Sequence, residues 1–354
     1  MEVRPPSMSD VADEAGVSQA TVSLVLNDVA GSGISASTKD RVRAVAKRMG
    51  YRHNAVARSL KLQRSDTIGF VSDRITTGPY AHGLVQGAHD AVRRVGKHLL
   101  ISNVEHGDGR SKEEAAEIAV VELLERRVDG IVFASVLPDS VEVPPALSEI
   151  PSVLLDVAAV DESLASIVPD EYAAAKMACD MLLEFGHRDI VHLSPLKAVP
   201  SVLRRRAGYV AAMTESGVRD LQPLVVEIDN STPSAYEASV EILDGASGPT
   251  AFFCYNDEMA WGVFQAAAEL DLVIPDDLSV VGFKNVPLIA PMLRPGLTTV
   301  ELPHYAMAEW AVSYLLDGRS DPVQKEVECP IIIRGSVGPP QRSQKASPLR
   351  RRSR

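Results

Sequence analysis

The sequence lacks the features that mark secreted and membrane-spanning proteins. Its three cysteines, Cys179, Cys254 and Cys329, lie far apart and form no C-x-x-C pair. No apolar run reaches the length of a membrane span, and the N-terminal M-E-V-R-P-P-S contains no apolar signal core. We therefore expect a cytoplasmic protein with no membrane partner, whose cysteines are reduced and buried in its core.

The chain also lacks the short motifs that carry enzyme chemistry. It contains no G-x-x-x-x-G-K-[ST] phosphate loop and no G-x-S-x-G nucleophile turn, and Gly107-Asp108-Gly109 does not continue as a dinucleotide fingerprint. The eight histidines form no H-E-x-x-H pattern, and His187, just before a predicted strand, is interpreted as structural. The sequence therefore predicts a protein that is not an enzyme and holds no cofactor and no metal.

Charge is distributed unevenly along the chain. The net charge is −11, yet residues 1–64 hold ten Lys or Arg against six Asp or Glu, and the tail at 341–354 holds six basic residues and no acidic one. A basic end joined to an acidic body favours attraction of nucleic-acid phosphates through one surface only. The tail is polar and unpatterned, so we expect disorder there. It is either a solvated segment without a fixed role or a second, non-specific contact to DNA.

Residues 9–27, S-D-V-A-D-E-A-G-V-S-Q-A-T-V-S-L-V-L-N, have the spacing of two short helices packed across a tight turn. Gly16 supplies the turn, and Ser9 and Ser18 stand at N-cap positions. The buried positions are Val11, Ala12, Ala15, Val17, Val22 and Val25. We interpret this segment as a helix-turn-helix. The alternative is a pair of packed helices from an unrelated small domain.

A third helix is predicted after the loop at 29–34. Ser35 is its candidate cap and Gly50 its C-terminal stop, and one face carries Val42, Val45, Ala46 and Met49. The following stretch at 54–62, N-A-V-A-R-S-L-K-L, is amphipathic and has few core partners. Its Leu60, flanked by Arg58 and Lys61, is suited to act as a wedge between base steps with cations beside the phosphates. The alternative is an inert linker.

From Thr67 onward the chain alternates short apolar runs with amphipathic helices. Strands are predicted at 67–71, 98–102, 129–134, 152–156, 188–193, 223–227, 250–254 and 279–283. Helices are predicted at 80–95, 111–126, 171–185, 203–216, 233–244, 256–270 and 304–316. This order predicts an α/β architecture of two doubly wound parallel-sheet lobes that change near 160–170. Ligand is expected at the carboxyl ends of the strands, in a cleft between the lobes.

The three predicted N-terminal helices (the headpiece, residues 9–51), the A-R-S-L segment and a series of later blocks together resemble the lactose/galactose-repressor family of bacterial transcription regulators. The blocks are T-I-G-F-V at 67, R-R-V-D-G-I-V at 126, F-G-H-R-D-I at 185, Y-N-D-E-M-A-W-G at 255, I-P-D-D-L-S-V-V-G-F at 274 and L-T-T-V at 297. The resemblance covers residues 8–340. It implies lobes of periplasmic-binding-protein type, three chain crossings between them, and a return to the first lobe near 297–320.

The resemblance also implies a function and a set of partners. It indicates a ligand-responsive transcriptional regulator, bound to the nucleoid, that represses carbohydrate-related genes. Its partners would be double-stranded operator DNA of palindromic sequence, a small effector (sugar, sugar acid or sugar phosphate) and a second copy in a homodimer or higher oligomer. An activator or dual regulator is the first alternative, and a stand-alone binding protein or an enzyme on this fold are further ones.

The predicted domains follow from these patterns. They are a disordered N-terminus at 1–8, a helix-turn-helix headpiece at 9–51, a hinge helix and linker at 52–66, the two-lobed core at 67–340, and the disordered basic tail at 341–354.

The second helix of the headpiece is predicted to read DNA. Gln19 can pair with adenine, while Ala20 and Leu24 can contact thymine methyl groups. In relatives the position of Leu24 often holds Arg or His, so a guanine contact is absent here. The predicted DNA-binding set is Ser18, Gln19, Ala20, Thr21, Ser23, Leu24, Asn27, Asn54, Arg58, Leu60 and Lys61, of which Ser18, Thr21 and Asn27 are expected on phosphates.

The resemblance further implies effector-binding positions. Tyr80 is expected to stack on the ligand or to cover it, Asp170 to accept a hydroxyl, and Arg205 to hold vicinal hydroxyls or a carboxylate in a bidentate contact. Asp257 either binds the ligand or only caps its helix. The full set is Asp73, Tyr80, Asp170, Arg205, Asn230, Asn256, Asp257 and Lys284.

Two departures from the family pattern concern the effector. Lys284 stands in G-F-K-N where many sugar-binding members have Asp, and Asn230 lies where relatives often place an aromatic ring. A lysine cannot accept a hydrogen bond, so an anionic effector becomes a candidate beside a neutral sugar. Alternatively Lys284 points to solvent, or pairs with Asp170 or Asp257 in the empty site.

Overall fold

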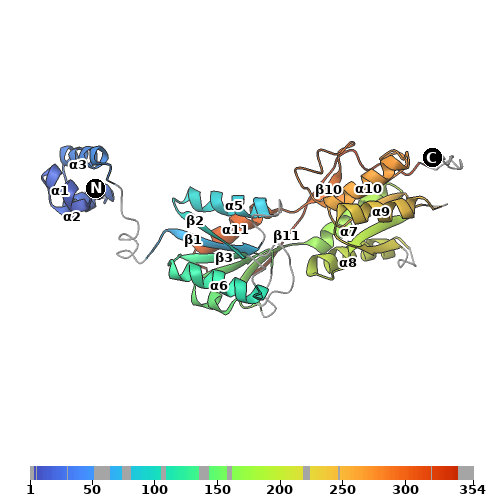
Figure 1. The fold of residues 1–354 in the computed structure, drawn as a ribbon, viewed down its shortest axis with the longest axis horizontal. Coiled ribbons are helices and arrows are strands. Elements are labelled where there is room, and N and C mark those ends of the chain that lie inside the picture. The colour runs from blue at the N-terminus through green and yellow to red at the C-terminus, as the bar shows by residue number, and fades with distance from the viewer. Residues whose placement is uncertain are drawn as a thin grey trace. The chain divides into compact units, whose positions relative to one another are not determined.

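The computed structural model describes residues 4, 6–29, 31–51, 64–73, 81–104, 109–134, 143–157, 162–217, 224–245, 248–319 and 321–341 (Figure 1). They divide into two compact units, Met1–Ser65 and Asp66–Arg354. The finer predicted boundaries, including the disorder expected at 1–8 and in the tail, stay predictions. No helix among the described residues has both the length and the apolar character needed to cross a bilayer.

The first unit is a three-helix headpiece of α1 (Met8–Ala15), α2 (Gln19–Leu26) and α3 (Ala36–Met49). The residues predicted as its core pack together in one cluster with Val17 and Met49 at its margin. Gly16 and Gly50 end α1 and α3 in the left-handed conformation, at φ 62° and 67°. The predicted caps Ser18 and Ser35 accept backbone N–H groups as expected.

The predicted cap of the first helix was wrong. Ser7, not Ser9, caps α1, because Asp10 stands three residues later and completes a capping box. The Ser7 backbone N–H donates to Asp10 Oδ2 at 2.6 Å, and the Asp10 N–H donates to Ser7 Oγ at 3.3 Å. Three residues after Ser9 stands Ala12, which has no acceptor to offer in return.

The second unit contains two six-stranded sheets, as predicted for two lobes. The first sheet has the order β11-β5-β4-β3-β1-β2, and every neighbouring pair is parallel. Its strands are β1 (Thr67–Asp73), β2 (His98–Val104), β3 (Gly130–Ala134), β4 (Ser152–Leu155), β5 (Ala165–Pro169) and β11 (Gln324–Val327). Helices α5 (Ala81–Arg94) and α11 (His304–Leu316) cover one face, and α6 (Lys112–Glu125) with the 3-10 helix η1 (Pro145–Glu149) covers the other (Figure 1).

The second sheet has the order β12-β10-β9-β8-β6-β7. Its strands are β6 (Ile190–Pro195), β7 (Val225–Ile228), β8 (Ala251–Cys254), β9 (Ser279–Lys284), β10 (Thr298–Glu301) and β12 (Ile331–Ile332). Only β12 runs antiparallel to its neighbour, β10. The α7 (Glu171–Glu184) and α8 (Pro200–Glu215) pair covers one face, and α9 (Thr232–Leu243) with α10 (Asp257–Glu269) covers the other.

The chain crosses between the lobes three times, as the resemblance implies. It passes from β5 into α7, from β10 into α11, and from β11 into β12. The return to the first lobe begins at His304 and not near 297, since β10 still pairs with β9 in the second lobe. β5, β10, β11 and β12 were not among the predicted strands. They are only two to five residues long, and β11 reads Q-K-E-V, without an apolar run.

His187 and the three cysteines are buried in the second lobe. His187 is 1 % exposed. Its Nδ1 lies 2.8 Å from Thr250 Oγ1, and its Nε2 lies 2.9 Å from the Gly338 carbonyl. It therefore joins the start of β8 to the last described segment, which confirms the structural interpretation. The three cysteines are buried and unpaired, as expected.

Candidate DNA-reading surface and effector site

The predicted base-reading residues share one outward face of α2. Gln19, Ala20 and Asn27 are exposed and Leu24 is 37 % exposed, whereas Val22 and Val25 on the opposite face are buried in the headpiece core. Leu24 is thus an apolar side chain exposed to solvent, although Val22 and Val25 of the same helix are buried in the headpiece core. An outward leucine on a short capped helix fits contact with an apolar group of a partner.

The polar residues at the ends of α2 bond within the helix. Ser18 Oγ accepts the Thr21 N–H at 3.1 Å and lies 2.9 Å from Thr21 Oγ1. Asn27 Nδ2 donates to the Ser23 carbonyl at 2.8 Å. These bonds fix both helix ends and leave further hydrogen-bonding positions on exposed atoms. Asn54, Arg58, Leu60 and Lys61, the remaining predicted DNA contacts, lie outside the described residues.

Most predicted effector residues meet at the carboxyl end of the second sheet. Asn230, Asn256 and Lys284 stand at or just after the ends of β7, β8 and β9, and Arg205 lies in the second turn of α8. Asp170 follows β5 of the first sheet and caps α7 of the second lobe. Parallel strands bring such ends to one edge. On the first-lobe side, Tyr80 and the side chain of Asp73 lie outside the described residues, so the structure places neither.

Arg205 is the inward member of the R-R-R run. Its guanidinium is 1 % exposed; Nη2 donates to Glu171 Oε1 at 2.5 Å and Nη1 to the Tyr255 carbonyl at 2.6 Å. The guanidinium also lies over the Phe283 ring, 3.8 Å from its centroid. The sequence led us to expect both terminal nitrogens on a ligand, but here they hold protein oxygens. Glu171, which sequence reasoning missed, supplies the matching charge.

The partners of Arg204 and Arg206 show which arginine of the run faces inward. Arg204 pairs with Glu326 of β11 and Arg206 with Glu227 of β7, and both arginines are more exposed than Arg205. Of the three arginines, only Arg205 is fully buried, whereas Arg206 also bonds Ser194 near the end of β6.

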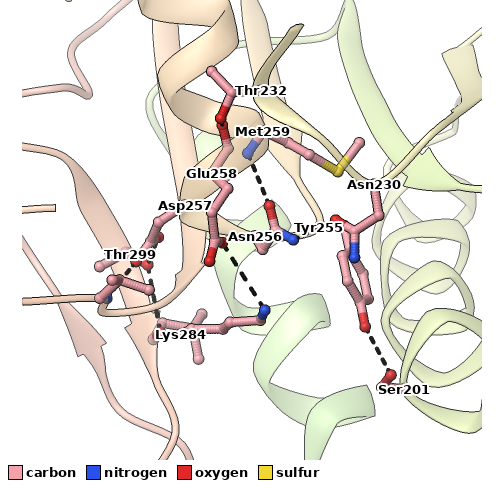
Figure 2. Close-up of polar contacts among 12 residues, drawn as sticks. Ser201, Asn230, Thr232, Tyr255, Asn256, Asp257, Glu258, Met259, Lys284 and Thr299 are labelled. Carbon is pink, nitrogen blue, oxygen red and sulfur yellow. Dashed lines mark hydrogen bonds and ion pairs between the residues drawn. The ribbon is translucent and has the colours of Figure 1, made fainter. Parts of the chain in front are cut away.

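Asn256 and Asn230 form a polar pair beside the start of α10. Asn256 Oδ1 accepts the Met259 N–H at 2.8 Å, and its Nδ2 donates to Asn230 Oδ1 at 2.6 Å (Figure 2). Asn256, not Asp257, is thus the N-cap of α10, and the expectation that Asp257 only caps its helix was wrong. Next to this pair, Tyr255 and Ser201, which the sequence analysis did not single out, share a hydrogen bond of 2.8 Å between their hydroxyls.

Asp257 is a fully buried carboxylate used within the protein. Its Oδ1 accepts the Thr299 hydroxyl at 2.6 Å (Figure 2). Its Oδ2 accepts the Val286 N–H, also at 2.6 Å. Burial raises the pKa of Asp257 to about 7, against the lowering effect of these two hydrogen bonds. Gly282 is needed beside it, because a Cβ there would lie 2.3 Å from Oδ1. Asp257 therefore holds β10 and the segment after β9 against α10.

Asp170 is also bonded inside the protein. It caps α7, and its Oδ1 accepts the Ala173 N–H at 3.0 Å. A carboxylate has about four lone-pair positions, so this bond leaves Asp170 able to accept a ligand hydroxyl as well.

Lys284 ends β9 with an unusual backbone, at φ 103°. Its side chain is 18 % exposed, and Nζ lies 3.9 Å from Glu258 Oε2, a partner that the sequence analysis did not anticipate (Figure 2). Burial lowers the pKa of Lys284. Glu171 and Glu258 were both missed because an acid in the first turn of a helix is ordinarily explained by the helix dipole.

Two titratable groups of the first lobe, His304 and Asp156, lie near this edge. His304, at the start of α11, lies 3.7 Å from Asp156, which follows β4. Burial, together with the charges of Lys284 and Arg205, lowers the pKa of His304 to about 3. The imidazole is thus neutral at pH 7. The described residues contain no group of His, Cys, Asp or Glu arranged to hold a metal ion.

Comparisons with known proteins match both units. The family described as bacterial regulatory proteins, lacI family, matches residues 7–54, and the periplasmic binding protein-like domain matches residues 179–337. Catabolite control protein A of Priestia megaterium is 34 % identical over 309 residues, 86 % of this chain and 90 % of that protein. The HTH-type transcriptional repressor PurR of Yersinia pestis bv. Antiqua (strain Antiqua) is 32 % identical over 338 residues, 94 % of this chain and 96 % of that protein.

Solved structures agree over nearly the whole length. The Lac repressor dimer bound to operator and the anti-inducer ONPF superposes with a TM-score of 0.80 at 26 % identity, covering 95 % of this chain and 100 % of that chain. The Lac repressor bound to ONPG in the repressed state gives the same TM-score at 28 % identity, covering 94 % of this chain and 100 % of that chain.

Proposed function

The chain belongs to the LacI family of DNA-binding transcriptional regulators, a family without enzymatic activity, and on that premise we propose that it represses carbohydrate-related genes under the control of a small effector. The observation that carries the proposal is the outward face of α2. Gln19, Ala20 and Leu24 project from a helix capped at both ends, while Val22 and Val25 secure it to the headpiece. Repression is preferred over activation because the relatives include a named repressor.

The operator is proposed to be a near-palindrome bound by a homodimer. One recognition helix covers only a few base pairs, so useful affinity requires two headpieces related by a two-fold axis. The Lac repressor, which covers the same span of chain, is a dimer on its operator. We assign base contacts to Gln19, Ala20 and Leu24 and backbone contacts to Ser18, Thr21, Ser23 and Asn27.

The segment at 54–62 is proposed to enter the minor groove between the two half-sites. Leu60 would partly unstack one base step, and Arg58, Lys61 and Asn54 would hold the adjacent backbone. The amphipathic pattern and the scarcity of core partners in the sequence support this assignment.

The effector is proposed to be a sugar, sugar acid or sugar phosphate bound at the carboxyl end of the second sheet. Polar groups converge there from the ends of β7, β8 and β9 and from the start of α7. The carboxyl ends of the strands are the usual place for a ligand in parallel α/β sheets. The proposed ligand set is Asp73, Tyr80, Asp170, Arg205, Asn230, Asn256, Asp257 and Lys284. Of these, Asn230 is exposed and Asp170 is half-buried, and both keep spare hydrogen-bonding capacity, whereas Asn256 is buried beside Asn230.

The experiment that tests the function uses the purified full-length protein and the palindromic DNA next to its own gene. Fluorescence anisotropy would measure the affinity, its fall with salt, and its change when sugars, sugar acids and sugar phosphates are added. We expect two protomers per fragment and a change in affinity with at least one compound class. A monomer that binds no such fragment would rule the proposal out.

A further inference from the structure

The backbone at Lys284 has a positive φ, a conformation that residues other than glycine rarely adopt. Lys284 and Asn285 have φ values of 103° and 53°. Asn285 Oδ1 accepts from Arg334 Nη2 at 2.7 Å, and the next N–H, that of Val286, donates to Asp257 at 2.6 Å. A strained conformation persists only where its surroundings impose it, and such residues cluster at functional sites. The end of β9 is therefore built to direct the lysine side chain to one place.

That place is the start of α10, beside Glu258. Lys284 Nζ and Glu258 Oε2 are 3.9 Å apart, within ion-pair distance but beyond hydrogen-bond reach (Figure 2). Glu258 Oε2 is itself buried and has no hydrogen-bond partner among the residues that the structure describes. A cationic donor and a carboxylate acceptor thus lie side by side, and the acceptor still lacks a hydrogen bond.

The charges around the pair of Lys284 and Glu258 determine which ligand group can bind to both side chains. Arg205, the other cation whose charge acts on Lys284, is already matched by Glu171 at 2.5 Å. Asp257 adds a further carboxyl group at the start of α10. An anionic group drawn to Lys284 would therefore meet Glu258 beside it, while the charge of Arg205 is already neutralised by Glu171. A hydroxyl group meets neither obstacle, because it accepts from Nζ and donates to Oε2 at the same time.

We propose that Lys284 and Glu258 together bind one hydroxyl of an uncharged, polyhydroxylated effector and select against acids and phosphates. This inference rests on the proposed function. It narrows the proposed effector from a sugar, sugar acid or sugar phosphate to an uncharged sugar. It also reverses the first expectation from the sequence, in which Lys284 favoured an anion. The lysine acts as one half of a donor–acceptor pair and not as a lone positive charge.

The test compares matched ligands by isothermal titration calorimetry on the full-length protein. The probes are galactose, glucose and ribose, each with its sugar acid and its terminal phosphate. We expect one neutral sugar to bind at least about tenfold more tightly than its own acid and phosphate, as repulsion by one nearby carboxylate requires. Glu258→Gln should reduce that ratio about tenfold, since it removes the repulsion and keeps an acceptor. Lys284→Met should weaken the neutral sugar about tenfold and should not improve binding of the acid.

The matched control is Glu269→Gln, the same change at the other end of α10, where Glu269 bonds the Tyr236 hydroxyl. It should leave the ratio of neutral to anionic ligand unchanged. Tighter binding of an acid or phosphate by the native protein overturns the inference and leaves the proposed function standing, as does an unchanged ratio in Glu258→Gln. If no probe binds and none changes the affinity for the operator, the inference and the proposed function are both overturned.

Discussion

The guanidinium of Arg205 and the carboxylate of Glu171 form an ion pair of 2.5 Å in which both side chains are almost entirely buried. Glu171 begins α7, which follows the first crossing between lobes, and Arg205 belongs to α8, so the pair joins the two helices on one face of the second sheet. The arginine that the family resemblance implied as a ligand clamp is therefore also an internal support.

The first prediction concerns that support. Glu171→Gln should lower the free energy of unfolding of the second unit by about 3 kcal/mol, because a buried guanidinium is left without its countercharge. Urea denaturation followed by circular dichroism measures the change. Glu326→Gln, which removes the exposed partner of Arg204, is the matched control and should cost under about 1 kcal/mol. Equal losses in the two variants would contradict the prediction.

The second prediction is a pH dependence from Asp257. Its folded-state pKa, raised to about 7 by burial, lies above that of an unfolded aspartate, near 4. The contribution of protonated Asp257 to the free energy of unfolding is fully present below about pH 4. It is lost as the pH rises to about 7, because the carboxyl group of the unfolded state releases its proton first. The free energy of unfolding of Asp257→Asn, measured at pH 5 and pH 8, should fall less over this interval than that of the native protein. Parallel pH profiles would show that the carboxyl group is not responsible.

The third prediction separates DNA reading from headpiece stability. Leu24→Ala should weaken operator binding by about 1 kcal/mol, the lower range for a base contact, with little change in melting temperature, since Leu24 is 37 % exposed. Val25→Ala, one residue further and 1 % exposed, should instead destabilise the headpiece by about 1–3 kcal/mol through the cavity it leaves. Anisotropy titrations and thermal melts of both variants distinguish the roles. Loss of stability in Leu24→Ala would assign it to the core.

The fourth prediction tests the wedge at the hinge. Leu60→Ala should weaken binding to the native operator about tenfold or more, because the energy of unstacking is no longer offset by burial of the side chain. The melting of the second unit should not change. Leu288→Ala, at a leucine 79 % exposed in that unit, is the control and should leave both properties as they are. Equal operator affinity of the Leu60 variant would refute the wedge.

Much of the fold could be predicted from the sequence because the signals are local. Each predicted helix from 80 to 316 and each predicted strand is present, with boundaries shifted by no more than three residues. Periodicity is strong where one face is buried, as in α5 and α7. It fails in β11 and β12, which have few apolar residues and lie at the edges of their sheets.

The site was less predictable because its side chains are partnered across the fold. Arg205 was identified by its motif, but nothing local indicates that Glu171, 34 positions earlier, neutralises it. Likewise Asp257 reads as a helix cap from the sequence, whereas its partners Val286 and Thr299 come from two other segments. Sequence motifs locate such residues, and only the tertiary contacts show whether they serve the ligand or the protein.

The three crossings have a consequence for the synthesis of the chain. The core of the first lobe includes Met307, Ala308, Ala311 and Val312 of α11, which follow the whole central part of the second lobe in the sequence. A ribosome must therefore translate α7 to β10 before the first lobe can close its core, and it must reach Ile331 before the second sheet gains β12. Neither lobe can finish folding as an N-terminal fragment, so the two mature almost simultaneously, near the end of translation.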